Sequence, residues 1–167
     1  MDTLNRLAVP QPEALRLALG RFATGVTIVT CCNADGAPAG LTASSFNALS
    51  IDPPLVLWSL RSASPSRPVF AAASHFTVNV LAEAQVDLSR RFASALPNKF
   101  AEGVWTAGTN GAPILAGCAA VFECETLSQQ VAGDHVLFIG RVLRVAESAV
   151  PPLVFQASHY RMLGEVL

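Results

Sequence analysis

Small hydroxyl side chains gather in two nearby segments of the sequence, together with one arginine. The first segment is "GLTASSFNALSIDPPLV" at 40–56 and the second is "SLRSASPSRP" at 59–68. The residues concerned are Thr42, Ser44, Ser45, Ser59, Arg61, Ser64 and Ser66. Such side chains donate hydrogen bonds and let backbone N–H groups approach a ligand, which suits a phosphate or a polar heteroaromatic ring. The same residue types are common in turns and helix caps, so their spacing leaves both interpretations open.

One histidine stands in surroundings that suit a binding site. His135 lies in "AGDHVLFIG" at 132–140, where Gly133 and Asp134 precede a strand-forming run. A side chain at such a strand end can project into a cleft, although a histidine satisfied only by Asp134 is the structural alternative. His75 precedes another strand in "SHFTVNV" and is interpreted as a surface or structural residue.

The sequence lacks several standard catalytic and metal motifs. It contains no GxGxxG after a strand, no GxxxxGK[ST], no HExxH and no GxSxG. Its three histidines are far apart, so we expect no zinc site and no other metal site.

The elements that must position these residues are predicted to be mainly strands. An amphipathic helix is predicted over 12–23, ended by Gly25, and a short helical patch over 69–74. Strands are predicted over 26–32, 37–46, 55–60, 76–81, 119–127 and 135–145, with 128–134 as a connection and 94–117 rich in loops. In 83–93, Val86, Leu88 and Phe92 are candidates to face a core. Strands at hairpin spacing without βαβ alternation favour a mainly antiparallel barrel with a few helices over a doubly wound sheet.

Composition narrows the class of protein. The chain has 167 residues, of which 51% are hydrophobic and 14% charged, so we expect one domain over 1–167 with a sizeable core. The net charge of -1 offers no basic field for nucleic acid or anionic lipid. No apolar run is long enough for a membrane span and the start lacks a signal layout, so we expect a cytoplasmic protein.

Cysteine usage and hydropathy add two expectations. Four cysteines, Cys31, Cys32, Cys118 and Cys124, lie in apolar runs without CxxC spacing, which predicts reduced, buried thiols. The mean hydropathy is positive, +0.43, so a second subunit is expected to cover part of the apolar surface. We therefore expect a homodimer.

Several segments, taken in order, resemble the short flavin reductases that serve two-component flavin monooxygenases. The matching pieces are "ALGRFATGVTIVT" at 18–30, "GLTASSFNALSIDPPLVLWSL" at 40–60, "FTVNVLAEAQVDLSRRFA" at 76–93, "NKF" at 98–100 and "GDHVLFIGRV" at 133–142, with Tyr160 near the end. The TASSF block with the following DPP, and GDH before a glycine-containing strand, are specific as an ordered set. The resemblance implies an FMN-binding split β-barrel that reduces FMN or FAD with NADH or NADPH and hands the reduced flavin to a separate oxygenase.

The resemblance also implies a flavin-contacting set. Its members are Thr42, Ala43, Ser44, Ser45, Ser59, Arg61 and Ser64. The first four would hold the isoalloxazine edge and ribityl chain through hydroxyls and backbone, and the last three would lie near the ribityl phosphate.

A second set lies farther along the chain. Arg91, Phe92 and Lys99 resemble residues near the phosphate or adenylate end of the ligand. His135 is similar to the family's nicotinamide-side histidine. The resemblance also implies contributions from Gly133, Asp134 and Tyr160, the first two by shaping the histidine's turn.

Other functions stay open on sequence grounds. The same barrel can be a flavin carrier without turnover, or a flavin-bound reductase of a corrinoid or ferric iron. A pyridoxamine phosphate oxidase-like enzyme shares the split barrel, but eleven scattered Lys and Arg residues suit its phosphate site poorly.

Overall fold

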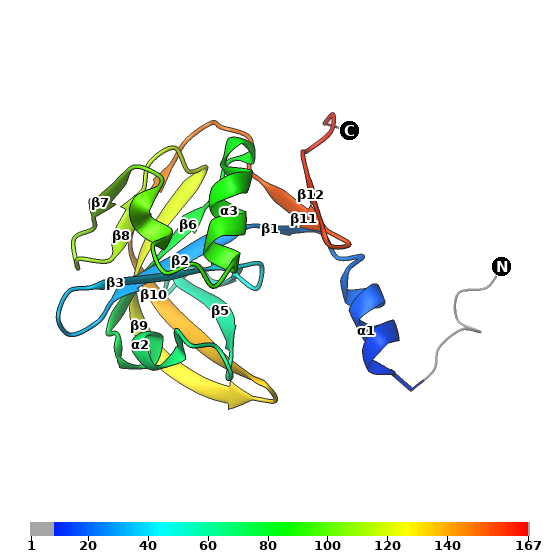
Figure 1. The fold of residues 1–167 in the computed structure, drawn as a ribbon, viewed down its shortest axis with the longest axis horizontal. Helices are drawn as coiled ribbons and strands as arrows, with labels where there is room; N and C mark the ends of the chain where they lie inside the picture. Colours follow the sequence, from blue (N-terminus) through cyan, green and yellow to red (C-terminus); the bar gives the residue numbers. More distant parts are fainter. Residues whose placement is uncertain (1–8, 167) are drawn as a thin grey trace.

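A seven-stranded antiparallel sheet forms the body of the protein. The computed structural model describes residues 9–166 (Figure 1). Across the sheet the strands are β3 (Pro38–Ala43), β2 (Thr27–Cys32), β6 (His75–Val80), β9 (Ala120–Ala132), β10 (His135–Glu147), β5 (Leu55–Arg61) and β4 (Asn47–Ser50). Each neighbouring pair is antiparallel. The mainly β, antiparallel prediction is therefore confirmed.

The two edge strands of this sheet are consecutive in the chain. β3 ends at Ala43 and β4 begins at Asn47, so residues 44–46 cross from one edge of the sheet to the other. The Ser45 hydroxyl bonds to the backbone of Ser59 on β5, which fixes this crossover beside the opposite edge. The sheet thus curls into the expected split barrel.

Strand alternation sends the core inward and the candidate site outward. On β5, Val56, Trp58 and Leu60 are buried, whereas Ser59 is half-buried and Arg61 exposed. Successive side chains of a strand point to opposite faces, so the hydroxyl and guanidinium groups leave the barrel on its outer side. The Trp58 ring stacks on Phe138 at 4.7 Å between centroids inside the barrel.

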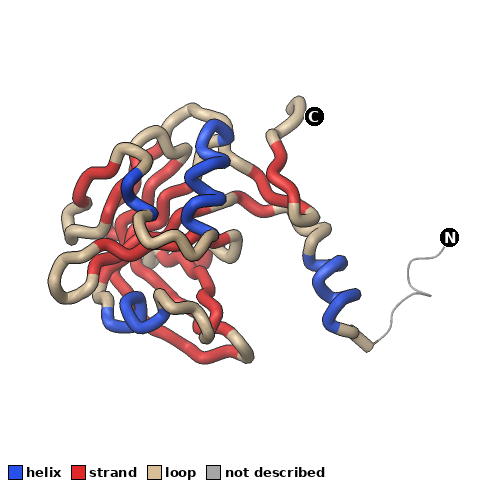
Figure 2. Tube along the Cα trace, in the orientation of Figure 1, coloured by secondary structure: helices blue, strands red, loops and turns tan. Residues whose placement is uncertain are grey.

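Helix α3 (Val86–Ala93) covers the outer side of the barrel at β3 and β2, following the short helix η2 (Glu83–Gln85) (Figure 2). Phe92 is 1% exposed and packs on Phe100 and Trp105. Gly40 of β3 permits this approach, because a Cβ there would lie 2.9 Å from the Phe92 ring. As expected, Phe92 faces a core, and this is a second core outside the barrel.

The remaining elements lie around this body. α2 (Arg67–Ala72) buries Phe70, and η3 (Lys99–Ala101) is followed by the hairpin of β7 (Trp105–Ala107) and β8 (Pro113–Leu115). A separate three-stranded sheet contains β1 (Thr24–Gly25), β11 (Val154–Gln156) and β12 (His159–Arg161). Figure 1 shows this sheet and α1 (Pro12–Leu19) standing away from the barrel. No residue of α1 is buried.

Three element predictions were wrong in part. The first helix ends at Leu19, capped by Gly20, and Gly25 belongs to a strand that pairs with β11. Strand β4 and the β7–β8 hairpin were not predicted as strands, because these short segments lack a clear alternation of apolar and polar residues. β9 continues through 128–132 to a two-residue turn at Gly133 and Asp134. This stretch is polar because both of its faces are exposed.

The thiols agree with their prediction. All four cysteines are free, with Cys31, Cys118 and Cys124 buried and Cys32 half-buried. Burial raises the pKa of each of the three buried thiols to about 12. Across residues 9–166, no helix is long and apolar enough to cross a membrane.

Candidate functional site

A cavity of about 530 Å³ opens on the outer side of the barrel beside α3. This volume lies within the range of small-molecule sites, roughly 300 to 1,000 Å³. Most of the predicted site residues line it: Thr42, Ala43, Ser44, Ser45, Ser59, Arg61, Ser64, Ser66, Phe92, Lys99 and His135. The cavity has two sides, which we name here. The strand wall comprises residues 42–45 with Ser59, Arg61 and His135, and the helix wall comprises residues 92–95 with Lys99.

Two hydroxyls of the strand wall are engaged within the protein. Ser45 Oγ donates to the Ser59 carbonyl at 2.9 Å and accepts from the Ser59 N–H at 3.0 Å. Thr42 Oγ1 donates to the Ser89 carbonyl of α3 at 2.6 Å. These side chains therefore fix the wall's shape, and what they offer a ligand is mainly their remaining acceptor capacity.

Other donors of the strand wall are available to a ligand. The hydroxyls of Ser44 and Ser59 and the guanidinium of Arg61 form no hydrogen bond to another described residue. Residues 44–46 belong to no strand, so their backbone N–H groups are not part of a ladder. This wall can thus present hydroxyl, amide and guanidinium donors to one ligand.

The pairing of β10 with β5 places His135 in the strand wall. This histidine is the register partner of Arg61 on β5, so both side chains leave the same face of the sheet. Its Nδ1 lies 2.8 Å from Asp134 Oδ1, and this hydrogen bond lowers the pKa of the Asp134 carboxyl. In the neutral imidazole, donation from Nδ1 to this carboxylate leaves Nε2 as the acceptor.

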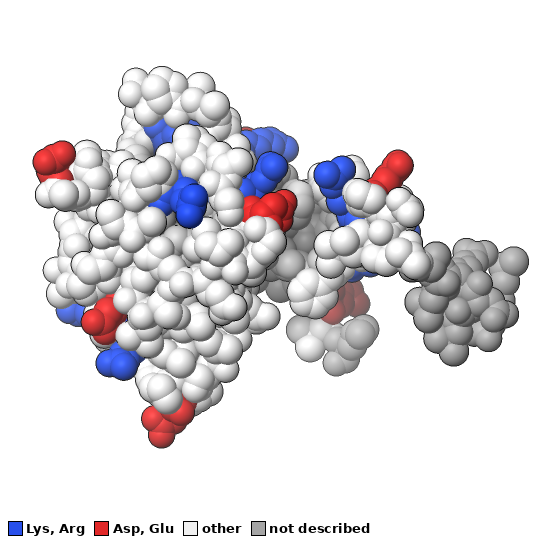
Figure 3. All heavy atoms as spheres, turned by 90° about the horizontal axis from the view of Figure 1, so that it is seen from below, with Lys and Arg blue, Asp and Glu red and all other residues white. Residues whose placement is uncertain are grey.

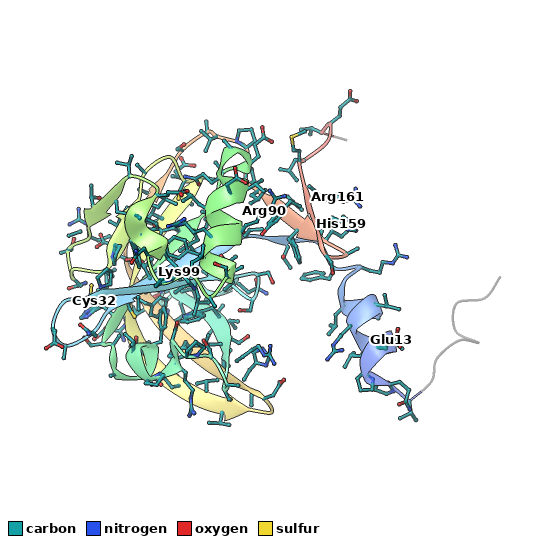
Figure 4. All side chains as sticks on the ribbon, viewed as in Figure 1. Glu13, Cys32, Arg90, Lys99, His159 and Arg161 are labelled. Carbon is teal, nitrogen blue, oxygen red and sulfur yellow. The ribbon has the colours of Figure 1, made fainter. Side chains whose placement is uncertain are left out.

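The helix wall is built from the last turn of α3 and the turn after it. Lys99 Nζ donates to the Phe92 carbonyl at 3.0 Å, and Figure 4 shows Lys99 beneath α3 and over β3. Partial burial lowers the pKa of the Lys99 ammonium. The last carbonyls of a helix carry partial negative charge, which this ammonium offsets.

Four predicted site residues do not line the cavity. Gly133 and Asp134 form the β9–β10 turn, where Asp134 holds His135. Tyr160 Oη is 2.9 Å from Ser89 Oγ, on the β12 side of α3. Arg91 is turned toward the backbone of residues 98 and 99. In this chain these residues support the walls and do not face the cavity.

The sequence did not point to several lining residues. They are Leu41, Leu60, Pro65, Ala93, Ser94 and Ala95. Leu41 and Leu60 neighbour predicted residues, so strand continuity was a usable signal. The Ala-Ser-Ala run at 93–95 gave no such signal, because small residues are common in the connection after a helix.

The electrostatic character of the cavity favours an anion. Its lining includes Arg61, Lys99 and a histidine, and none of its lining residues is acidic. The face drawn in Figure 3 shows charged residues only at scattered points, so any selectivity for an anion comes from local groups. A ligand combining a polar ring with a phosphate matches both walls.

Comparison with known proteins identifies the family of the chain. The family model described as "Flavin reductase like domain" matches residues 19–164. A probable flavin reductase of Rhizobium meliloti is 44% identical over 159 residues, which are 93% of this chain and 51% of that protein. The FMN reductase (NADH) SmoA of Agrobacterium fabrum is 41% identical over 148 residues, covering 89% of this chain and 84% of that one. The chain thus spans only about half the length of some curated relatives.

A solved structure extends the comparison to three dimensions. The NADH:FAD oxidoreductase SgcE6 of Streptomyces globisporus, in complex with NAD and FAD fragments, superposes with a TM-score of 0.88 at 32% identity. The match covers 95% of this chain and 98% of that one. A family model over nearly the whole chain and relatives above 40% identity give one conclusion: this chain belongs to the flavin reductase-like family.

Proposed function

We propose that the protein reduces FMN or FAD with NADH or NADPH and supplies the reduced flavin to a partner monooxygenase. The observation that supports this proposal is the lining of one cavity. It combines neutral hydrogen-bond donors, two cationic side chains and a histidine, and none of its residues is acidic. Relatives support the assignment, since one is named an FMN reductase (NADH) and another the reductase component of a flavin-dependent monooxygenase.

The strand wall suits the flavin ring. Ser44, Ser59 and the backbone of residues 44–46 can donate to the ring's polar edge, where negative charge accumulates on reduction. When bound, the flavin supplies the hydride-accepting chemistry. The protein positions the ring and excludes water.

The cations suit the phosphate end of the ligand. Arg61 lies at the end of β5 and Lys99 on the helix wall, so a phosphate can meet one cation from each side of the cavity. Charge-assisted bonds of this kind are stronger than neutral ones and fix the orientation of a nucleotide.

His135 suits the nicotinamide end of the dinucleotide. Asp134 holds Nδ1, and in the neutral imidazole Nε2 can then accept a hydrogen bond from the NH2 group of the carboxamide. In this role the histidine orients the second ring against the flavin and need not transfer a proton.

The direct test is anaerobic mixing of the protein with each flavin and each nicotinamide nucleotide. Bleaching of the oxidised flavin's visible absorbance, faster than in a protein-free control, is the expected result. Unchanged absorbance with all four pairings would contradict the reductase assignment and leave a flavin carrier. The pairing with the highest kcat/KM would identify the physiological flavin and nucleotide.

We further infer a homodimer of single-domain subunits. Helix α1 exposes Leu17 and Leu19, and Phe22, which follows the helix, is 72% exposed. The chain exposes 10541 Å², whereas a compact monomer of this mass exposes roughly 7,900 Å². A second copy packed on Leu17, Leu19 and Phe22 would remove these apolar side chains from water.

The dimer has its own test. Replacing Leu17 and Phe22 together by glutamate should convert the protein to a monomer by light scattering at micromolar concentration. A dimer that survives this double substitution would place the interface elsewhere.

The free thiols agree with a reducing, cytoplasmic compartment.

A further inference from the structure

Arg91 holds the backbone turn that carries Lys99. Its guanidinium donates to the Lys99 carbonyl at 2.9 Å and to the Asn98 carbonyl, and pairs with Glu102 at 3.0 Å. The Arg91 side chain is only 18% exposed, whereas that of Glu102 is 63% exposed. The Arg91 guanidinium therefore donates to the turn at 98–99 and to Glu102.

Lys99 is thereby fixed to α3 at two points. Its carbonyl accepts from Arg91, and its ammonium donates to the Phe92 carbonyl one residue farther along the same helix. An ammonium has three donors, so the bond to Phe92 leaves two for a ligand. The residue before it, Asn98, is exposed and offers the turn no packing of its own.

We propose that Arg91 is a positioning residue for the nucleotide phosphate. It does not touch the ligand; it holds the turn at residues 98–99 so that the Lys99 ammonium meets the phosphate at the helix wall. The inference rests on the proposed function, because it takes the bound anion to be the phosphate of a flavin nucleotide. The resemblance implied instead that Arg91 itself lies near the phosphate or adenylate end of the ligand.

The guanidinium fork explains why arginine suits this position. A planar group with five donors can reach two adjacent carbonyls and a carboxylate at once, which a lysine ammonium on a flexible stem does poorly. Without the fork, the turn loses the backbone attachment to α3 that Arg91 supplies and keeps only the bond from the Lys99 ammonium to the Phe92 carbonyl. Lys99 would then lose a defined position relative to the cavity.

Arg90 provides a matched control on the same helix. It is exposed, pairs with Asp87 at 3.1 Å, and lies over the Tyr160 ring at 5.5 Å. Figure 4 shows Arg90 on the side of α3 that faces the β11–β12 hairpin, away from Lys99. Replacing either arginine by glutamine removes the same charge from the same helix.

The experiment measures dissociation constants for FMN and for riboflavin, which lacks the phosphate. The variants are Arg91→Gln, Arg91→Lys, Lys99→Met, the double variant Arg91→Gln with Lys99→Met, and Arg90→Gln. Lys99→Met should weaken FMN about fivefold to tenfold and leave riboflavin within about twofold. Arg91→Gln should do nearly the same, and the double variant should be no weaker than Lys99→Met alone.

Each other outcome overturns the inference in a recognisable way. Additive losses for FMN in the double variant would mean that Arg91 contacts the phosphate directly. Equal losses for FMN and riboflavin, or the same loss in Arg90→Gln, would mean a general structural role or a long-range charge effect. If Arg91→Gln fails to fold, Arg91→Lys must show the FMN-selective loss.

The failure of this inference can be told from failure of the proposed function. If wild-type protein binds FMN and riboflavin equally well, the protein does not recognise the phosphate. That result would contradict the inference about Arg91 but not the flavin site. If the protein binds neither, the flavin assignment falls as well. Binding is measured without a nicotinamide nucleotide, so the result does not depend on turnover.

Discussion

The two walls of the cavity are held in place by different means. The strand wall follows from backbone pairing, with Arg61 and His135 in register and Ser45 bonded to the backbone of β5. The helix wall depends on side-chain bonds from Arg91 and Lys99 to backbone carbonyls. In the proposed function, recognition of the ring and the nicotinamide would therefore depend on the barrel itself, and the helix wall's part in phosphate recognition would depend on a few side-chain contacts.

The walls meet where α3 lies against β3. Gly40 lies under the Phe92 ring, and Thr42 donates to the Ser89 carbonyl. Changes at this seam should move the helix wall relative to the strand wall. Changes at wall residues away from this seam should stay local.

The largest expected effect is at the seam. Gly40→Ala places a methyl group 2.9 Å from a Phe92 ring that Phe100 and Trp105 hold in place. Because that ring has little room to shift, we expect the free energy of unfolding to fall by about 1–3 kcal/mol. Chemical denaturation would measure the fall, and flavin titration should show weaker binding.

Gly25 gives the control for this substitution. A Cβ there meets nothing within 4 Å, so Gly25→Ala should leave stability and binding nearly unchanged. If Gly40→Ala were as stable as Gly25→Ala, the seam would be looser than the contacts indicate. The strand and helix walls could then not be coupled through Phe92.

The second effect separates two neighbouring serines of the strand wall. Ser45→Ala leaves the half-buried Ser59 N–H and carbonyl without the bridging hydroxyl, which should cost about 1–2 kcal/mol of unfolding free energy. Ser44→Ala removes an exposed hydroxyl with no partner in the described chain, so it should weaken flavin binding without lowering stability. Identical stability losses in the two variants would contradict this division.

The third effect tests the nicotinamide side. His135→Ala should raise the KM for the dinucleotide about tenfold, the loss of one good hydrogen bond, and change the flavin dissociation constant far less. Asp134→Asn keeps a hydrogen-bond acceptor at this exposed position, so its KM should rise less. An equal loss of flavin affinity with an unchanged KM would remove His135 from the nicotinamide site.

How much of the site was predictable differs between the walls. The strand wall was predicted through the resemblance of the ordered TASSF and GDH blocks, whereas the hydroxyls at strand ends suited turns and caps equally well. Strand register keeps such residues together, because it is set locally by alternation and turns. The helix wall was predicted in part: the resemblance pointed to Phe92 and Lys99, and nothing in the sequence pointed to residues 93–95. Arg91 and Lys99 were assigned to the same role, although one bonds to a carbonyl of the other.

Tertiary context explains the errors in the fold as well. The helix prediction over 12–23 used apolar spacing, but the structure uses Thr24 and Gly25 to pair with β11, more than a hundred residues away. The long polar end of β9 pairs with β10 through backbone hydrogen bonds, and its side chains do not show the alternation that would predict a strand. Neither partner can be read from a local window of sequence.

The smallest expected effect is a pH dependence confined to the helix wall. Burial lowers the pKa of Lys99, so this lysine loses its proton at a lower pH than an exposed lysine does. The phosphate of FMN is already a dianion above about pH 7, since its second pKa is near 6. The preference for FMN over riboflavin should therefore be greatest near neutral pH and fall a few-fold as pH rises through the lowered lysine pKa. Lys99→Arg stays charged throughout and should keep its preference; the same fall in that variant would assign the titration to another group.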